Sequence, residues 1–136
     1  MRYIHLSQSD QLPIISGVRP FKAVIIVAEP VPAERRDAIS QWLVDAGCLY
    51  VMTWGPDSAA WEAAVQQVNR DAHVADEIPD DQLVMTTSHT QESLQDIFWF
   101  SKYTAMHPCC EITMTVLLDL APARREKEIR AQYDAV

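Results

Sequence analysis

A histidine, a serine and two carboxylates each follow an apolar segment of this sequence, where a parallel sheet would gather them. They are His89, Ser88, Glu29 and Asp57. A carboxylate could orient His89 as a general base, and Ser88 or a water molecule would then attack a substrate. The same residue types also bind divalent cations. The sequence thus contains one candidate catalytic group, although no motif specifies its geometry.

The same residues also have a purely structural explanation. Asp57, Ser58, Ser88 and Thr90 are of the types that accept hydrogen bonds from the first turn of a helix. Glu29 could simply face solvent. The candidate group therefore competes with an interpretation in which these side chains cap helices.

Trp54 is a second kind of candidate, for binding rather than catalysis. It lies beside Gly55 and Pro56, just beyond an apolar segment. A large ring at such a position walls a pocket or anchors a partner. The alternative is that Trp54 covers the core beneath the loop.

Phosphate-binding motifs are missing from the sequence. The three glycines, Gly17, Gly47 and Gly55, are far apart, which excludes a dinucleotide fingerprint and a Walker-type loop. No cofactor is expected.

The three cysteines do not form a recognisable site. Cys109 and Cys110 are adjacent, Cys48 is distant, and paired C-x-x-C spacing is absent. We interpret them as small core residues in a reducing compartment, and we expect no metal. A redox role is the alternative.

The negative charge is concentrated in one part of the chain. The net charge is -8, and residues 57–96 hold nine carboxylates against Arg70 alone. This acidic segment would repel nucleic acid and attract a basic protein. The acids most suited to contact such a partner are Asp57, Asp76, Glu77, Asp80 and Asp81. The alternative is a solvated surface that keeps the protein soluble.

Strands and helices alternate along the chain. The apolar run 21–28 predicts a central strand buried on both faces, and 2–6 predicts a strand at the edge of the sheet. Further strands are predicted at 48–53, 83–87 and 112–120, the last with the alternation of an edge strand. Helices are predicted at about 33–46, 58–72 and 91–105, and Pro122 is expected to begin a last helix.

These elements predict a three-layer α/β/α sandwich with a mainly parallel sheet of four or five strands, as one domain over residues 1–136. The architecture resembles small Rossmann-like or flavodoxin-like bacterial domains, which host many functions. Ligands of such sheets bind beyond the carboxyl ends of the strands. Any site is therefore expected there.

The predicted helix 91–105 is apolar over more than half of its circumference, because Trp99, Phe100 and Tyr103 lie off its main stripe. Either the last helix packs beside it or its outer side meets another chain. The second option would make the protein a homodimer.

No stretch is long and apolar enough for a membrane span, and the N-terminus lacks the features of a signal peptide. We therefore expect a cytoplasmic protein that does not bind membranes.

Two functions are compatible with these features. The first is an accessory or immunity-type interaction module, which would bind a basic protein through the acidic segment and Trp99. The second is a small hydrolase or ligand-binding enzyme with its site around Glu29, Asp57, Ser88 and His89.

Overall fold

The structure is a computed structural model that describes residues 1–74 and 77–136. Its elements, in chain order, are β1 (Arg2–Leu6), β2 (Phe21–Val27), α1 (Ala33–Asp45), β3 (Cys48–Trp54), α2 (Ser58–Asp71), η2 (Asp80–Gln82), β4 (Met85–His89), α3 (Leu94–Tyr103), β5 (Met114–Leu120) and α4 (Glu126–Asp134).

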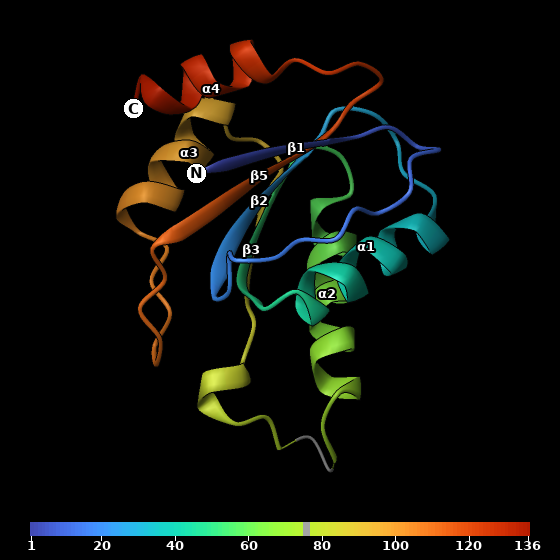
Figure 1. Ribbon diagram of the computed structural model, residues 1–136, viewed down its shortest axis with the longest axis vertical. Coiled ribbons are helices and arrows are strands. Elements are labelled where there is room, and N and C mark those ends of the chain that lie inside the picture. Colours follow the sequence, from blue (N-terminus) through green and yellow to red (C-terminus); the bar gives the residue numbers. More distant parts are fainter. Residues whose placement is uncertain (75–76) are drawn as a thin grey trace.

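The sheet is open and all its strand pairs are parallel, in the order β1-β5-β2-β3-β4 (Figure 1). All residues of β2 are buried, because β2 has a neighbour on each side and helices over both faces. The predicted central strand is therefore confirmed, and so is the position of β1 at the edge. The prediction that residues 112–120 form an edge strand is wrong. β5 lies between β1 and β2, and its residues from 115 onward are buried.

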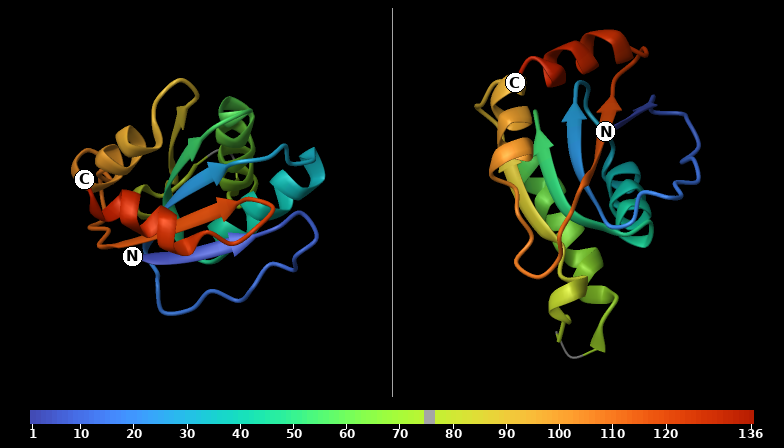
Figure 2. Two further views of the ribbon diagram at one scale, coloured as in Figure 1. Left: turned by 90° about the horizontal axis from the view of Figure 1, so that it is seen from above. Right: turned by 60° about the vertical axis from the view of Figure 1, so that its left-hand side comes forward.

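Helices cover both faces of the sheet, which confirms the predicted sandwich. α1 and α2 pack on one face, and α3 and α4 pack on the other (Figures 1 and 2). The first layer buries Leu43 and Trp61 against the sheet. The second buries Ile97, Phe98 and Ile129. Burial of these large side chains, each worth about 1.5–3 kcal/mol, holds the layers together.

Two helices begin later than their sequence patterns predict. α3 begins at Leu94, because Ser93 and Asp96 form a capping box in which each side chain accepts a hydrogen bond from the backbone N–H of the other. α4 begins at Glu126 and not near Pro122. The connection before α4 is therefore a loop, and this loop contains Arg125.

α4 packs beside α3, as one of the two interpretations of the aromatic helix requires. Phe98 of α3 meets the ring of Tyr133 edge-on, with centroids 5.4 Å apart. Trp99 and Tyr103 nevertheless remain 54% and 60% exposed on the outer side of α3. The C-terminal helix thus covers only part of the apolar surface.

None of the helices in residues 1–74 and 77–136 has both the length and the apolar character needed to span a bilayer.

Candidate functional site

The carboxyl ends of the strands bring together residues that are far apart in the sequence. His5, Asp119, Ile26, Trp54 and His89 are successive register partners across the sheet. They form one row on the face covered by α3 and α4. The connections after β2 and β3 lead to α1 and α2 on one face of the sheet, whereas those after β5 and β4 lead to α4 and α3 on the other. A binding crevice opens where the connections of neighbouring strands diverge in this way.

A crevice of about 570 Å³ lies at this end. It receives residues from the ends of β2, β3 and β4 and from the loop between β5 and α4. Its lining consists of Val27, Ala28, Trp54, Gly55, Pro56, Thr90 and Arg125. We call this cavity the carboxyl-end crevice. Its volume is within the usual range for small-molecule sites, about 300–1,000 Å³.

Arg125 is the charged residue of this lining, and Asp119 holds it in place. Arg125 Nε and Nη2 donate to the two carboxylate oxygens of Asp119 at 3.0 and 2.9 Å. Asp119 is completely buried, whereas the side chain of Arg125 is 33% exposed. The bond to Asp119 raises the pKa of Arg125 above its ordinary value, so the guanidinium remains protonated. A guanidinium has five N–H groups, and three of them are not used by this pair.

Tyr3 completes the support of Arg125 from the edge strand. Its hydroxyl donates to Asp119 Oδ2 at 2.6 Å and accepts a hydrogen bond from the backbone N–H of Arg125 at 3.2 Å. Burial, followed by the bond to Asp119, raises the pKa of Tyr3 to about 12. Tyr3 therefore stays a neutral donor, and both the side chain and the backbone of Arg125 are fixed.

Trp54 walls the crevice from the end of β3. Its Nε1 donates to the carbonyl oxygen of Glu92 at 2.7 Å, and this bond fixes the ring. The next residue, Gly55, has φ of +111°. A Cβ atom at Gly55 would lie 2.5 Å from the carbonyl oxygen of Val27, so only glycine fits here.

His89 is the last residue of β4, which covers Met85–His89 and not the predicted 83–87, and it is 5% exposed. Its Nδ1 is 2.9 Å from Glu92 Oε2, and its Nε2 is 2.8 Å from Thr87 Oγ1. The ring also meets Phe100 edge-on. Both ring nitrogens are thus engaged within the fold.

Ser88 is not brought to His89. Successive side chains of a strand point to opposite faces of the sheet. Thr86, two residues before Ser88, bonds to Gln66 and Glu62 of α2, so Ser88 also lies on the α2 side, where it is exposed. His89 packs on the α3 side.

Neither Glu29 nor Asp57 bonds to the histidine, whose ring nitrogens are engaged by Thr87 and Glu92. Glu29 borders a small cavity beside Arg35, on the α1 side. Asp57 follows Pro56 of the crevice lining, has a left-handed backbone with φ of 61°, and is exposed. Asp57 is the residue before α2, but its carboxylate accepts no hydrogen bond from the backbone N–H groups of the first turn of α2. The four candidate side chains therefore form no hydrogen-bonded group with one another, and a catalytic role for them stays a prediction.

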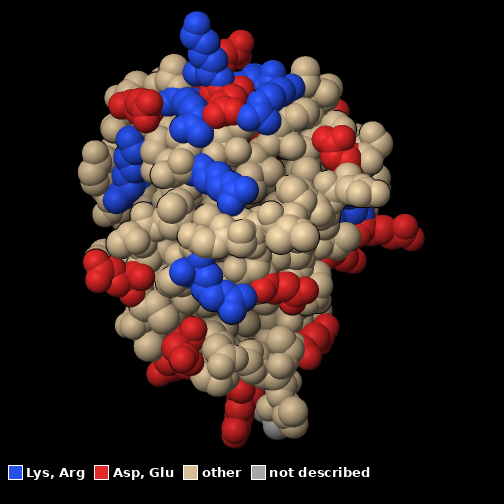
Figure 3. All heavy atoms as spheres, in the orientation of Figure 1, with Lys and Arg blue, Asp and Glu red and all other residues tan. Residues whose placement is uncertain are grey.

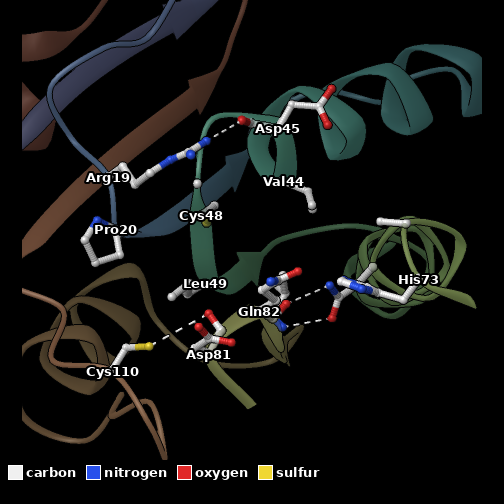
Figure 4. A pocket seen from close by; sticks show the side chains of 14 residues that line it. Arg19, Pro20, Val44, Asp45, Cys48, Leu49, His73, Asp81, Gln82 and Cys110 are labelled. Atoms are coloured by element: carbon white, nitrogen blue, oxygen red, sulfur yellow. Dashed lines mark hydrogen bonds between the residues drawn. The ribbon is translucent and has the colours of Figure 1, made fainter. Parts of the chain in front are cut away.

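A second cavity, of about 560 Å³, lies at the amino ends of the strands (Figure 4). We call it the amino-end cavity. Its polar groups largely bond within the fold. Arg19 donates to the carbonyl oxygen of Asp45, and Asn69 bonds to the backbones of Gln82 and Val84. We therefore regard the carboxyl-end crevice, whose arginine is oriented by two bonds to a completely buried carboxylate, as the better candidate site.

The cysteines are placed differently from one another. Cys48 is buried, as expected of a core residue, whereas Cys109 is exposed and Cys110 is half-buried. The interpretation of all three as core residues is therefore wrong for Cys109. In the part of the chain that the structure describes, no group of three or more histidine, cysteine or carboxylate side chains could hold a metal ion.

The acidic residues predicted to bind a partner lie mainly on the connection between α2 and β4. Glu77, Asp80 and Asp81 are exposed, and Asp76 lies outside the described residues. η2, on this connection, lies toward the lower end of the molecule (Figure 1). On the face drawn in Figure 3, acidic side chains predominate at that end, while most of the visible lysines and arginines lie in the upper part.

Arg125 and Asp119 were not recognised as a pair from the sequence. The expected start of a helix at Pro122 places Arg125 in its first turn instead of in a loop. One signal does point to the pair, because Asp119 is an acidic residue within the apolar run of 116–120. A buried carboxylate requires a partner, and the arginine six residues later can supply it.

Comparison with known proteins identifies a family but no activity. A family model described as a domain of unknown function (DUF7684) matches residues 1–136. No curated protein and no solved structure matches the chain.

Proposed function

This chain belongs to the DUF7684 family, and we propose that it is a ligand-binding domain whose site is the carboxyl-end crevice. The ligand carries an anionic group, which Arg125 binds. The observation that carries this proposal is the pairing of Arg125, at the crevice, with the completely buried Asp119.

The energetics of the pair support a functional role. Burying a carboxylate costs several kcal/mol, and a buried ion pair is often no more stabilising than apolar side chains of the same size. Asp119 and Arg125 are therefore poorly explained by stability alone. Their bidentate geometry instead orients the guanidinium so that its remaining donors can bind a carboxylate or phosphate group.

The other residues that line the crevice indicate the chemistry of the remaining, non-anionic part of the ligand. Trp54, Pro56, Val27 and Ala28 present aromatic and aliphatic surface. The tryptophan ring is fixed by its bond to Glu92, so it could stack on a flat group at little entropic cost. The expected ligand thus combines an anionic group with a flat apolar part.

The aromatic sulfonate 8-anilinonaphthalene-1-sulfonate has both parts and is a suitable probe. We expect the native protein to bind it with quenching of tryptophan fluorescence. Arg125→Gln should weaken binding about tenfold or more, as loss of a charged hydrogen bond implies. Arg125→Lys keeps a charge opposite Asp119 and should also weaken binding, because lysine lacks the planar fork.

Arg124→Gln is the matched control, because it removes the same charge from an adjacent, exposed side chain. It should change the affinity less than twofold. Equal losses for Arg124→Gln and Arg125→Gln would mean that only the overall charge matters, which would refute the site.

A second candidate is the interaction module that binds a basic protein. It is favoured by the exposed Glu77 and Asp80, because η2 contains Asp80, follows Glu77 closely and lies toward the lower end of the molecule, away from α4 (Figure 1). Its ionic contacts would weaken as salt rises.

Binding to immobilised polylysine tests this second candidate. The double variant Glu77→Lys/Asp80→Lys should lose salt-sensitive binding. Asp45→Lys/Asp134→Lys makes the same charge change at other exposed positions and should retain it. If the two double variants lose binding equally, the acidic end is not a docking surface.

Self-association through α3 is a related proposal, based on the exposed Trp99 and Tyr103. Light scattering tests it directly. A dimer mass for the native protein and a monomer mass for Trp99→Ser would support it, whereas a monomeric native protein would refute it.

A further inference from the structure

Two adjacent thiols lie in the loop that joins α3 to β5. Cys109 is exposed and Cys110 is half-buried, and neither is bridged. The loop lies at the amino ends of the strands, opposite the carboxyl-end crevice, and Cys110 contributes to the wall of the amino-end cavity (Figure 4). The ligand site proposed above makes no use of these thiols.

His107 organises this loop. Its Nδ1 accepts hydrogen bonds from the backbone N–H groups of Cys109 and Cys110, both at 3.1 Å. Its Nε2 donates to the carbonyl oxygen of Leu83 at 2.6 Å. Nδ1 thus accepts and Nε2 donates, which are the two hydrogen-bonding roles of an imidazole ring. Because both nitrogens are engaged, the reactive groups that the loop presents are the two thiols.

We propose that Cys109 and Cys110 are a redox-active dithiol that closes reversibly to a disulfide between adjacent residues. The oxidant is a low-molecular-weight disulfide of the glutathione type. The thiolate of Cys109 attacks one sulfur of that disulfide, forms a mixed disulfide and releases the first small thiol. The thiolate of Cys110 then attacks the Cys109 sulfur and releases the second. The two protein thiols give up two protons and two electrons, which the two released thiols carry.

The order of attack follows from the surroundings of the two sulfurs. Cys109 is exposed and can meet the oxidant. Cys110 is less accessible, its Sγ lies 3.9 Å from the carbonyl oxygen of Asp81, and burial raises the pKa of its thiol. Cys109 is therefore the attacking residue and Cys110 the resolving residue.

Because the two cysteines are adjacent, we expect their disulfide to be easily reversed and not to stabilise the fold. Consecutive Cα atoms across a trans peptide are about 3.8 Å apart, whereas bridged cysteines usually have Cα atoms at least about 4.4 Å apart. The closed ring is strained, and strained exposed disulfides are easily reduced.

Formation of the disulfide should also change the structure outside the loop that contains the two cysteines. Closing the bridge removes the S–H proton that Cys110 directs toward the carbonyl oxygen of Asp81. Asp81 belongs to η2, which helps to line the amino-end cavity. Oxidation therefore alters the wall of that cavity, while the carboxyl-end crevice stays unchanged.

Cys48 provides an internal control. It is buried, and burial raises the pKa of its thiol to about 12. It should not react in the folded protein.

The test is to incubate the native protein with oxidised glutathione and to measure its intact mass and its reactive thiols. We expect a monomer lighter by the mass of two hydrogen atoms, with the Cys48 thiol titratable only after unfolding. Dithiothreitol should reverse the change. Cys110→Ser should instead stop at a stable glutathione adduct on Cys109.

Two results would overturn the proposal. One is accumulation of the glutathione adduct on the native protein to the same extent as on Cys110→Ser. The other is a disulfide between two chains. Backbone NMR shifts confined to the 104–113 loop and η2 on oxidation would further support the bridge, whereas unchanged shifts in η2 would refute its link to the amino-end cavity.

Discussion

At the residue scale, Asp119 is the side chain whose burial most needs explanation. It lies within an apolar strand, is completely buried, and bonds to Tyr3 and Arg125. Tyr3 and Asp119 are 116 positions apart in the sequence. These hydrogen bonds therefore connect the edge strand to the loop that carries Arg125. Ionisation of the Tyr3 hydroxyl reports on them, because it removes the proton that Tyr3 donates to Asp119.

We predict that stability at alkaline pH depends on Tyr3. Burial and the bond to Asp119 raise its pKa from 10.0 to about 12. The folded state therefore holds the phenolic proton more tightly than the unfolded state. The resulting stabilisation is complete below pH 10 and is lost as the pH rises through about 12. Urea unfolding across this range should show a free energy that falls faster in the native protein than in Tyr3→Phe, by up to about 1.4 kcal/mol per pH unit.

Other groups with shifted pKa values, such as Cys48, are present in both proteins. The difference between the two curves therefore isolates Tyr3. Parallel curves for the native protein and Tyr3→Phe would contradict the prediction.

Gly55 is the second residue with a specific backbone requirement, and we predict a large cost for Gly55→Ala. The added Cβ would lie 2.5 Å from the carbonyl oxygen of Val27, in addition to the strain of a positive φ. We expect a loss of at least about 2 kcal/mol in the free energy of unfolding. Chemical denaturation measures this loss.

Gly17→Ala is the matched control, because Gly17 also has a positive φ but an added Cβ would meet nothing within 4 Å. Its cost should be about 1 kcal/mol. Similar losses at Gly17 and Gly55 would show that the close approach to Val27 is unimportant.

At the element scale, lysines secure the layer formed by α3 and α4. Lys22 of β2 donates to the carbonyl oxygen of Ser101, near the end of α3. Lys102 of α3 donates to the carbonyl oxygens of Tyr133 and Val136 at 2.6 and 2.8 Å. These carbonyls lie at the C-terminal ends of helices, where the last C=O groups have no N–H partner within the helix. Positive charge is favourable at such ends.

We predict that Lys102→Met loosens α4 without unfolding the domain. Methionine retains an apolar side chain but loses the ammonium group, at a cost of about 1–2 kcal/mol. Hydrogen exchange of the α4 amides should become faster, while exchange in α1 should not change. Lys127→Met, at an exposed position of α4, is the control. Equal effects of the two variants would argue against the bonds from Lys102.

At the scale of the whole molecule, charge is unevenly distributed. The net charge is -8, and η2, which contains Asp80 and Asp81, lies toward the end of the molecule away from α4 (Figure 1). Like charges close together repel one another at low salt. This end therefore lowers the stability of the folded state slightly.

We predict that Glu77→Lys/Asp80→Lys raises the thermal midpoint at low salt, by an amount equivalent to about 0.5 kcal/mol. At about 1 M salt the Debye length is about 3 Å, and the difference should disappear. Calorimetry at both salt concentrations measures this. A difference that persists at high salt would indicate a local structural cause.

Much of the fold was predictable because its signals are local. The apolar run of β2 indicated a central strand, and the stripe containing Trp61 indicated a helix that packs on the sheet; both are confirmed. The exact start of α3 was missed because its capping box, Ser93 with Asp96, competes with other polar residues just upstream.

Local sequence patterns were thus sufficient for the α/β class and the central strand, and they predicted the end of the sheet where a site would lie. Hydrophobic periodicity reports how each residue is buried within its own element, and this information is local. Only the packed fold shows that β5 lies between β1 and β2 and that Ser88 and His89 lie on opposite faces of β4. It alone joined Tyr3, Asp119 and Arg125, because strand order is set by packing between elements distant in the chain.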